Sequence, residues 1–262
     1  MVSSEQMRIA LIGSGRVATC MGPQLKAAGH TIACVYSRTM ANARELAEAL
    51  DAPATDSLDN LPEADVYLTM LTDDALARLA PAIVKGRENA LFLHTAGSIP
   101  MDIWKYAGAG RYGVLYAMQT FSKGARIDWP QVPVFVEGSN IAELEIVKAL
   151  ASDLSARVAE LSSAGRKKLH VAAVFTCNFS NHMYAIADKL LATEGVPFSV
   201  MLPLVRETAR KVETMSPQDA QTGPAVRGDR KVINEHLELL KDYPEYAQLY
   251  RLISVDINKD LK

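Results

Sequence analysis

Apolar runs and helical patterns alternate along the first part of the chain. The apolar runs, which predict β-strands, lie at 8–13, 31–37, 65–71, 90–95, 113–118, 133–138 and 156–161. The segments with helical spacing lie at 17–28, 41–50, 74–84, 101–106 and 141–154. Because continuous apolar strands that alternate with helices are typical of a parallel sheet covered on both faces, we expect an α/β fold with a doubly wound, mainly parallel sheet.

The pattern changes after Ser162, where helical spacing replaces the alternation. Helices are predicted at 166–191, 198–215, 231–240 and 245–257. Stretches that contain Gly or Pro separate these helices at 195–197, 216–218, 223–224 and 242–244. We therefore predict an α/β domain over 1–161 and a smaller all-α domain over 162–262.

The turn after the first predicted strand reads IGSGRVA at 12–18 and places Gly13, Gly15 and Ala18 in the G-x-G-x-x-G/A pattern. The first glycine permits a tight turn, and the second lets the backbone approach a pyrophosphate. The helix N-terminus then offers free N–H groups to the phosphates. This strand–turn–helix context predicts a Rossmann-type dinucleotide site, and a tight turn that binds no ligand is the alternative.

The end of the second predicted strand indicates which dinucleotide binds. A site for NAD places Asp or Glu there to bind the ribose 2′-hydroxyl, whereas this strand ends at Ser37, Arg38 and Thr39. The two hydroxyls can donate to a 2′-phosphate, and Arg38 can pair with it. We therefore expect NADP. A solvated loop arginine is the alternative, and the missing acid disfavours a methyltransferase.

Composition and charge exclude several classes of partner. Apolar residues make up 49% of the 262 residues, and the formal net charge is −2. We see no basic stripe for nucleic acid and no apolar run long enough for a membrane span. The three cysteines lack metal or redox spacing, and no leader precedes the first strand. These features predict a cytoplasmic protein with no metal, nucleic acid or membrane partner.

Several longer motifs extend the dinucleotide pattern over the whole chain. They are LFLHTAGSIP at 91–100, AMQTFSKG at 117–124, LHVAAVFTCNFSNH at 169–182 and QTGPAVRGD at 221–229. With them the sequence resembles the putative NADP oxidoreductases that join a Rossmann domain to a C-terminal domain of unknown function. These belong to the superfamily of pyrroline-5-carboxylate reductase, prephenate dehydrogenase and 6-phosphogluconate dehydrogenase. The resemblance implies an NADP-binding fold, a cleft between the domains and a homodimer. Because helical domains rich in apolar residues often supply dimer interfaces, we expect the homodimer to form through the helical domain.

The sequence departs from this family at two adjacent positions. Related sequences often carry His-Pro where this chain has Tyr116-Ala117. In prephenate dehydrogenases a histidine at the comparable strand end is catalytic. Its absence argues against a prephenate-like mechanism.

The ends of the later strands carry candidate catalytic residues. His94 ends the fourth long strand, where ligands of open parallel sheets bind, and it could donate a proton to a carbonyl or imine. A structural histidine bonded to a backbone carbonyl is an equal alternative. Gln119 and Thr120 follow the next strand and could recognise a substrate, although turn capping is the alternative, especially for Thr120.

The predicted helix at 166–191 has an unusual polar content around an apolar AAVF stretch, so we expect it to be largely buried. In related dehydrogenases the equivalent helix contributes polar catalytic groups. We therefore predict that Asn178 and His182 are catalytic, with structural hydrogen bonds across a dimer interface as the alternative. Cys177 is interpreted as a small buried apolar residue. In the GPAVRGD motif, Asp229 is expected to cap a helix, and Arg227 could instead bind a substrate anion.

These observations predict an NADP-dependent oxidoreductase that transfers a hydride between NADP(H) and a small carbonyl, imine or hydroxy substrate. A non-catalytic NADP sensor or regulatory protein is the alternative, and hydride exchange with a flavin or deazaflavin is a third possibility. The predicted catalytic residues are His94, Gln119, Asn178 and His182. The predicted cofactor contacts are Gly13, Ser14, Gly15, Arg16, Val17, Ser37, Arg38, Thr39, Leu71, Thr72, Thr95 and Ala96.

Overall fold

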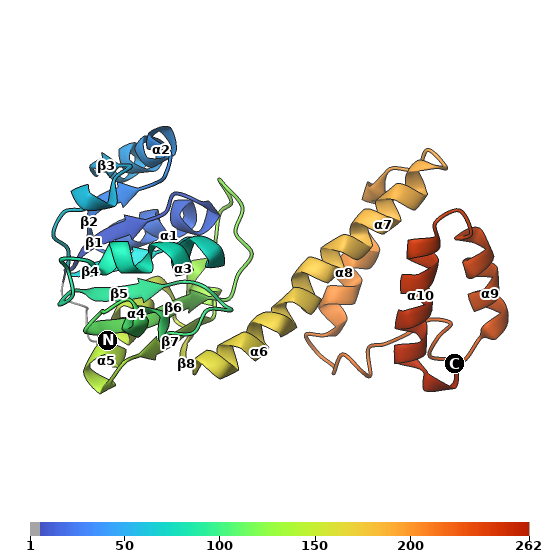
Figure 1. Ribbon diagram of the computed structural model, residues 1–262. Helices are drawn as coiled ribbons and strands as arrows, with labels where there is room; N and C mark the ends of the chain where they lie inside the picture. The colour runs from blue at the N-terminus through green and yellow to red at the C-terminus, as the bar shows by residue number, and fades with distance from the viewer. Residues whose placement is uncertain (1–5, 262) are drawn as a thin grey trace. The chain divides into compact units, whose positions relative to one another are not determined.

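The computed structural model describes residues 6–261, which divide into two compact units, Met1–Cys177 and Asn178–Lys262 (Figure 1). The first unit is built on an eight-stranded sheet in the order β3-β2-β1-β4-β5-β6-β7-β8. Its strands are β1 (Arg8–Ile12), β2 (Thr31–Tyr36), β3 (Ala54–Thr55), β4 (Val66–Thr69), β5 (Leu91–His94), β6 (Arg111–Ala117), β7 (Val134–Gly138) and β8 (Val158–Glu160). All neighbours pair in parallel except β6 and β7, which are antiparallel.

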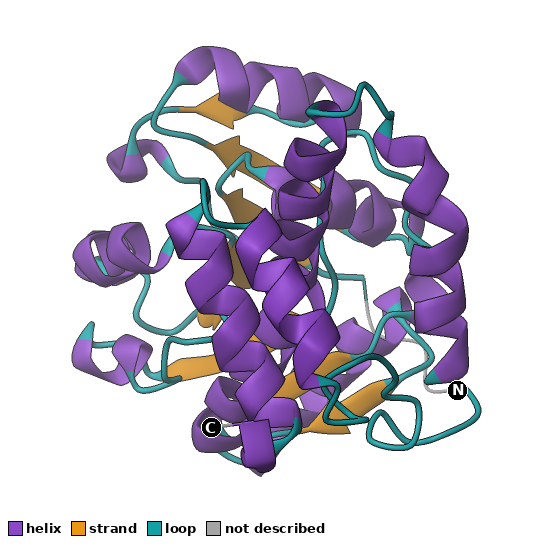
Figure 2. Cartoon of the chain, turned by 90° about the vertical axis from the view of Figure 1, so that its right-hand side faces the viewer, coloured by secondary structure: helices purple, strands orange, loops and turns teal. Residues whose placement is uncertain are grey.

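Helices flank the strands of this sheet (Figure 2). They are α1 (Arg16–Ala27), α2 (Met40–Leu50), α3 (Asp73–Val84), α4 (Ile103–Tyr106) and α5 (Ile141–Leu154), with short 3₁₀ turns at Leu58–Asn60 and Trp129–Gln131. Helix α6 (Ser163–Ala173) follows β8 and extends away from the sheet (Figure 1). Successive residues of β1 enter two separate cores: Ile9 and Leu11 pack in one, Ala10 and Ile12 in the other. A sheet with two buried faces explains the continuous apolar strands, and the predicted doubly wound fold is confirmed.

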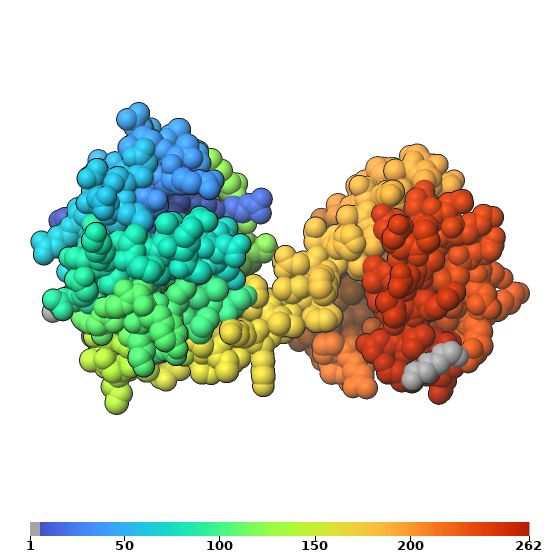
Figure 3. All heavy atoms as spheres, viewed as in Figure 1, coloured from blue at the N-terminus to red at the C-terminus, as the bar shows by residue number. Residues whose placement is uncertain are grey.

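The second unit is helical. It contains α7 (Ser180–Ala192), α8 (Leu202–Lys211), α9 (Arg230–Leu239) and α10 (Pro244–Ile257), with 3₁₀ turns at Phe198–Met201 and Lys259–Leu261. Its described residues form no strand, as predicted. In the space-filling view, the C-terminal residues, drawn in red, form much of the visible face of this unit (Figure 3). Few of its side chains are buried: among the described residues they are Ala225, Ile233, Leu240 and Ser254.

The helix predicted at 166–191 is helical throughout but is not a uniform α-helix. A π-helical segment, Val174–Phe179, joins α6 to α7, and the boundary along the chain between the two units falls within it, after Cys177. The expectation that this helix is largely buried is wrong, because Val171 is 56% exposed and Asn178 and His182 are exposed. The apolar residues of this helix show which of its faces is apolar. They do not show that other parts of the same chain cover that face. The functional boundary at 161/162 stays a prediction.

Three smaller differences separate the predicted helices and strands from the observed ones. The two-residue strand β3 escaped prediction because it is too short to carry an alternation. Helix α4 is shorter than the predicted 101–106, and the predicted helix at 198–215 divides into a 3₁₀ turn and α8. Ends of helices are the least determined part of any sequence pattern.

Substitution of Asn140 tests whether a side-chain N-cap stabilises helix α5. Its Oδ1 accepts a hydrogen bond from the backbone N–H of Glu143 at 3.0 Å, which caps α5. Asn140→Ala should lower the free energy of unfolding by about 1 kcal/mol. Asn140→Asp keeps the acceptor and should change it much less. Urea denaturation of the two variants makes the comparison, and equal losses would contradict the capping role.

Candidate functional site

The glycine-rich turn lies between β1 and α1. Gly13 has a φ of +127°, and a Cβ there would approach the carbonyl oxygen of Met70 within 2.5 Å, so only glycine fits. Gly15 is exposed, and a Cβ there would meet no atom within 4 Å. It precedes α1, whose first turn holds no acid and whose N-cap makes no side-chain hydrogen bond. These residues therefore fit a pyrophosphate, because free helix N–H groups and an open approach are what such a group needs.

The end of β2 lies beside this turn. The hydroxyl of Ser14 donates to that of Ser37 at 2.9 Å, which ties the two segments together. Arg38 and Thr39 are exposed, and no hydrogen bond or ion pair to Arg38 occurs within residues 6–261. The guanidinium is therefore available to an anion at the end of β2, which fits the 2′-phosphate of NADP.

The remaining predicted cofactor contacts follow β4 and β5. Leu71 and Thr72 follow β4 after the single residue Met70, and Thr95 and Ala96 come directly after β5. The backbone N–H of Thr95 donates to the carbonyl of Thr69 at 3.2 Å, so the two strand ends are joined. Because β2, β1, β4 and β5 are parallel neighbours, the structure brings these segments to one carboxyl edge of the sheet.

The surroundings of His94 favour a structural role over a role as proton donor. Its ring is 0% exposed, and its Nδ1 accepts a hydrogen bond from the N–H of Ala96 at 3.2 Å. Burial and, to a smaller extent, the positive charge of Arg166 lower its pKa to about 3, against a smaller opposing effect of the Pro100 backbone. A neutral imidazole with no exposed atom favours the structural interpretation of His94 over the proposed proton donor.

Arg166 on α6 is a buried charge that the sequence pattern did not reveal. Its side chain is 1% exposed, and its guanidinium donates to Glu137 Oε2 at 2.6 Å. It also donates to the carbonyls of Ala96 at 3.2 Å and Ile99 at 2.6 Å. A charge this deeply buried needs such partners, and they connect α6 to the loop after β5 and to β7. We call these groups, together with Ser163, the Arg166 cluster.

Ser163 completes the Arg166 cluster at the start of α6. Its backbone N–H donates to Glu137 Oε1 at 2.8 Å and its hydroxyl to Oε2 at 2.7 Å. The same hydroxyl accepts the N–H of Met101 at 2.9 Å. A carboxylate at a helix N-terminus is also favoured by the helix dipole. The cluster therefore fixes where α6 begins.

Tyr116 and His170 form a second polar contact at the same carboxyl edge. The Oη of Tyr116, at the end of β6, lies 3.1 Å from Nδ1 of His170 on α6. Tyr116 is buried, which raises its pKa, while Arg166 acts in the opposite direction. Sequence reasoning missed this pair because the two residues lie far apart in the chain. The one feature of the sequence that pointed to this pair is Tyr116, which stands where related sequences often carry histidine.

The other predicted catalytic residues form no hydrogen bond with this pair within residues 6–261. Gln119 is exposed, and its Oε1 accepts the N–H of Thr120 at 2.8 Å within a local turn. Asn178 and His182 belong to the second unit, where both are exposed. Their catalytic roles stay predictions.

Two smaller predictions in the second part of the chain have clear outcomes. Cys177 lies in the π-helical segment and is exposed, so its interpretation as a buried apolar residue is wrong. Asp229 Oδ1 accepts the N–H of Val232 at 3.2 Å and caps α9, as expected. Arg227 is exposed, and its role toward an anion stays a prediction.

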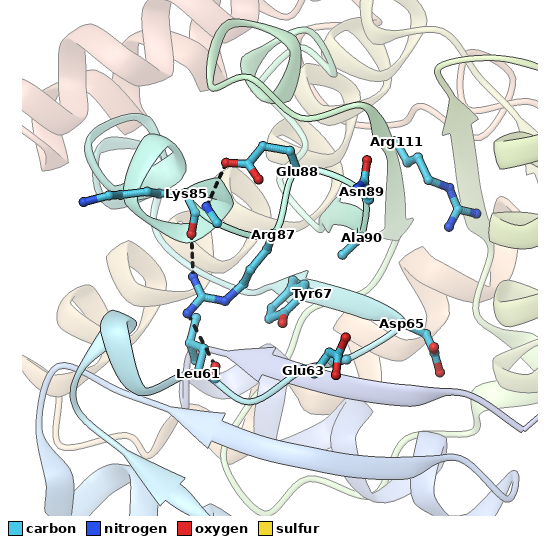
Figure 4. Close-up of a pocket in the computed structure, with 12 residues that line it drawn as sticks. Leu61, Glu63, Asp65, Tyr67, Lys85, Arg87, Glu88, Asn89, Ala90 and Arg111 are labelled. Carbon is cyan, nitrogen blue, oxygen red and sulfur yellow. Dashed lines mark hydrogen bonds between the residues drawn. The ribbon is translucent and has the colours of Figure 1, made fainter.

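A large cavity of about 630 Å³ lies away from these residues (Figure 4). Its lining includes Glu63, Asp65, Arg87, Glu88 and Arg111, which precede or begin β4, β5 and β6. It therefore opens at the amino edge of the sheet, whereas ligands of such folds bind at the carboxyl edge. Its size alone does not make it the nucleotide site.

Among residues 6–261, no three His, Cys, Asp or Glu side chains gather in a way that could hold a metal ion. Across the same part of the chain, every helix is too short or too polar to cross a membrane.

Comparisons with known proteins agree with this geometry. A family model described as "NADP oxidoreductase coenzyme F420-dependent" matches residues 8–93, and one described as a domain of unknown function (DUF2520) matches residues 132–257. A solved structure from Bacteroides fragilis, described as a "putative NADP oxidoreductase", is 48% identical. That match covers 97% of this chain and 98% of the other, with a TM-score of 0.92. No curated protein matches the sequence.

More distant structures share the fold. A reductive aminase from Aspergillus terreus, in complex with NADPH and ethyl levulinate, is 19% identical, with a TM-score of 0.60 and coverage of 89% of this chain and 78% of the other. A 1-pyrroline-5-carboxylate reductase from Streptococcus pyogenes is 16% identical, with a TM-score of 0.63 and coverage of 97% and 99%. At these identities the likeness shows the fold alone.

The glycine turn, the open helix N-terminus and the sheet topology define a Rossmann dinucleotide-binding protein. Within that class, the chain belongs to the NADP oxidoreductase family whose members join this Rossmann domain to the C-terminal domain of unknown function. The predicted family and the predicted cofactor, NADP, are confirmed.

Arg38 should determine the preference for NADPH over NADH. Arg38→Ala removes the cation available to the 2′-phosphate, so the Kd for NADPH should rise by at least about tenfold, while the Kd for NADH changes little. Arg44→Ala removes an exposed charge from α2 and should leave both values near wild type. Isothermal titration of both cofactors makes the test, and an equal loss for both would contradict the assignment.

Proposed function

We propose that the protein is an NADP-dependent oxidoreductase that transfers a hydride between NADP(H) and a small carbonyl, imine or hydroxy substrate. One observation carries the proposal: the glycine turn, Arg38 and the loop after β5 follow parallel neighbouring strands at one carboxyl edge. With a pyrophosphate at Gly13 and a 2′-phosphate at Arg38, the nicotinamide end extends past β4 toward β5. When bound, NADPH supplies the hydride.

The remaining groups at this edge suit reduction of a polar double bond. The backbone around Ala96 and Gly97 is held by Arg166, and Tyr116 and His170 provide exchangeable protons beside it. One distant neighbour is described as a reductive aminase in complex with NADPH and ethyl levulinate, and another as a 1-pyrroline-5-carboxylate reductase, and these descriptions support this substrate class. No acid–base pair in the described residues singles out one member of the class.

NADPH oxidation against a panel of aldehydes, ketones and cyclic imines tests the proposal. Wild type should turn over at least one class, and Arg38→Ala should raise the KM for NADPH by at least about tenfold with a smaller change in kcat. Micromolar NADPH binding with no turnover across the panel would contradict the proposal and favour an NADP sensor.

We also propose that the protein is a homodimer formed through its helical unit. A domain of this size buries more than half of the surface of its unfolded chain, whereas few described side chains of this unit are buried. Large apolar side chains are exposed instead, among them Leu204 at 63% on α8 and Leu252 at 61% on α10. A second copy of the same apolar helices is the partner that matches this surface.

A charge placed on the helical surface should separate the two copies. Leu204→Glu and Leu252→Glu each place a charge in the proposed interface, so each should raise the dimer Kd by at least about tenfold. Tyr106→Glu changes an 83% exposed aromatic residue of the first unit and should leave the dimer intact. Sedimentation velocity gives the masses, and a monomeric wild type at micromolar concentration would refute the dimer.

A further inference from the structure

The side chains of Tyr116 and His170 form a hydrogen bond and also pack against each other through their rings. Their rings lie edge to face, with centroids 6.2 Å apart and planes at 74°. The hydroxyl of Tyr116 has two neighbours: His170 Nδ1 at 3.1 Å, and the sulfur of Met118, which accepts from it at 3.8 Å. The distances allow two directions: the hydroxyl donates to His170 Nδ1, or His170 Nδ1–H donates to Oη while the hydroxyl donates to Met118. We assign the second direction, a chain of hydrogen bonds that runs from His170 through Tyr116 to Met118.

This direction fixes the state of the other ring nitrogen. With its proton on Nδ1, a neutral His170 carries a lone pair on Nε2, and the imidazolium carries a proton there. No hydrogen bond to Nε2 occurs within residues 6–261, and the side chain is half-buried. Nε2 is therefore the nitrogen that can exchange a proton with a bound molecule.

Gly97 provides the space for this ring. A Cβ on Gly97 would come within 2.5 Å of His170 Nδ1 and 2.7 Å of Cγ, so only glycine allows the imidazole to lie against the loop after β5. Arg166 lies one helical turn before His170 and holds the same loop through Ala96. The ring is thus fixed beside the segment that follows β5.

We propose that His170 is the proton donor of the reduction and that Tyr116 orients it, an inference that rests on the proposed function. As a carbonyl or imine carbon gains the hydride from NADPH, its π bond breaks and the electron pair moves to the heteroatom. The Nε2–H bond of the His170 imidazolium breaks, its proton bonds to the heteroatom, and its electron pair stays on Nε2. NADP⁺, neutral His170 and an alcohol or amine remain, and the reverse reaction uses Nε2 as the base.

Nuclear magnetic resonance tests the pair without any turnover. Long-range ¹H–¹⁵N spectra of protein labelled on histidine should show neutral His170 with its proton on Nδ1. Tyr116→Phe should move the proton to Nε2. His236 and Tyr250 form a matched pair, with Nδ1 and Oη 2.9 Å apart, so Tyr250→Phe should leave His170 unchanged. A His170 proton on Nε2 in wild type would overturn the assigned direction.

Kinetics test the catalytic role. His170→Gln should lower kcat at least about 100-fold with an unchanged Kd for NADPH, because a general acid contributes that much. Tyr116→Phe and Gly97→Ala should fall between this variant and wild type, and Tyr250→Phe should match wild type. An active His170→Gln would overturn the inference and leave the proposed function intact. An inactive wild type would refute the proposed function, and the proton transfer with it.

Discussion

The buried guanidinium of Arg166 is the interaction on which the arrangement of the carboxyl edge depends. A charge that is 1% exposed is stable only if its attraction to Glu137 and its hydrogen bonds to Ala96 and Ile99 offset the loss of water. Removing one partner of such a pair leaves an unpaired buried charge, at a cost of about 3–5 kcal/mol. Arg166 and its partners therefore connect three segments: the loop that follows β5, the strand β7 and the start of α6.

The chemistry of the site follows from this constraint. Because α6 begins at the Arg166 cluster, His170 lies one turn further along and meets Tyr116 at 3.1 Å. The same positive charge, added to complete burial, keeps His94 neutral. The two histidines near this edge thus have different roles: His94 supports the loop, while His170 keeps a ring nitrogen available to a bound molecule.

The sequence predicted most of the fold because strands and turns are encoded locally. The strand alternation, the glycine turn and the residues after β2 each lie within a few positions, so periodicity and turn chemistry reveal them. Arg166 and His170 meet partners far away in the chain, and no spacing predicts such contacts. The helix around Val171 was predicted to be buried and is exposed. The apolar pattern of a helix predicts an apolar face, but it does not predict that the same chain covers this face.

A crystal structure with bound NADP⁺ tests this arrangement most directly. We expect the pyrophosphate to bind at Gly13–Gly15 and the 2′-phosphate to bind Arg38. We expect the nicotinamide to lie beside Ala96 and Gly97, with His170 Nε2 facing its C4 atom. A nicotinamide bound at the amino edge of the sheet, or a His170 ring that has left Tyr116 and points away from C4, would contradict it.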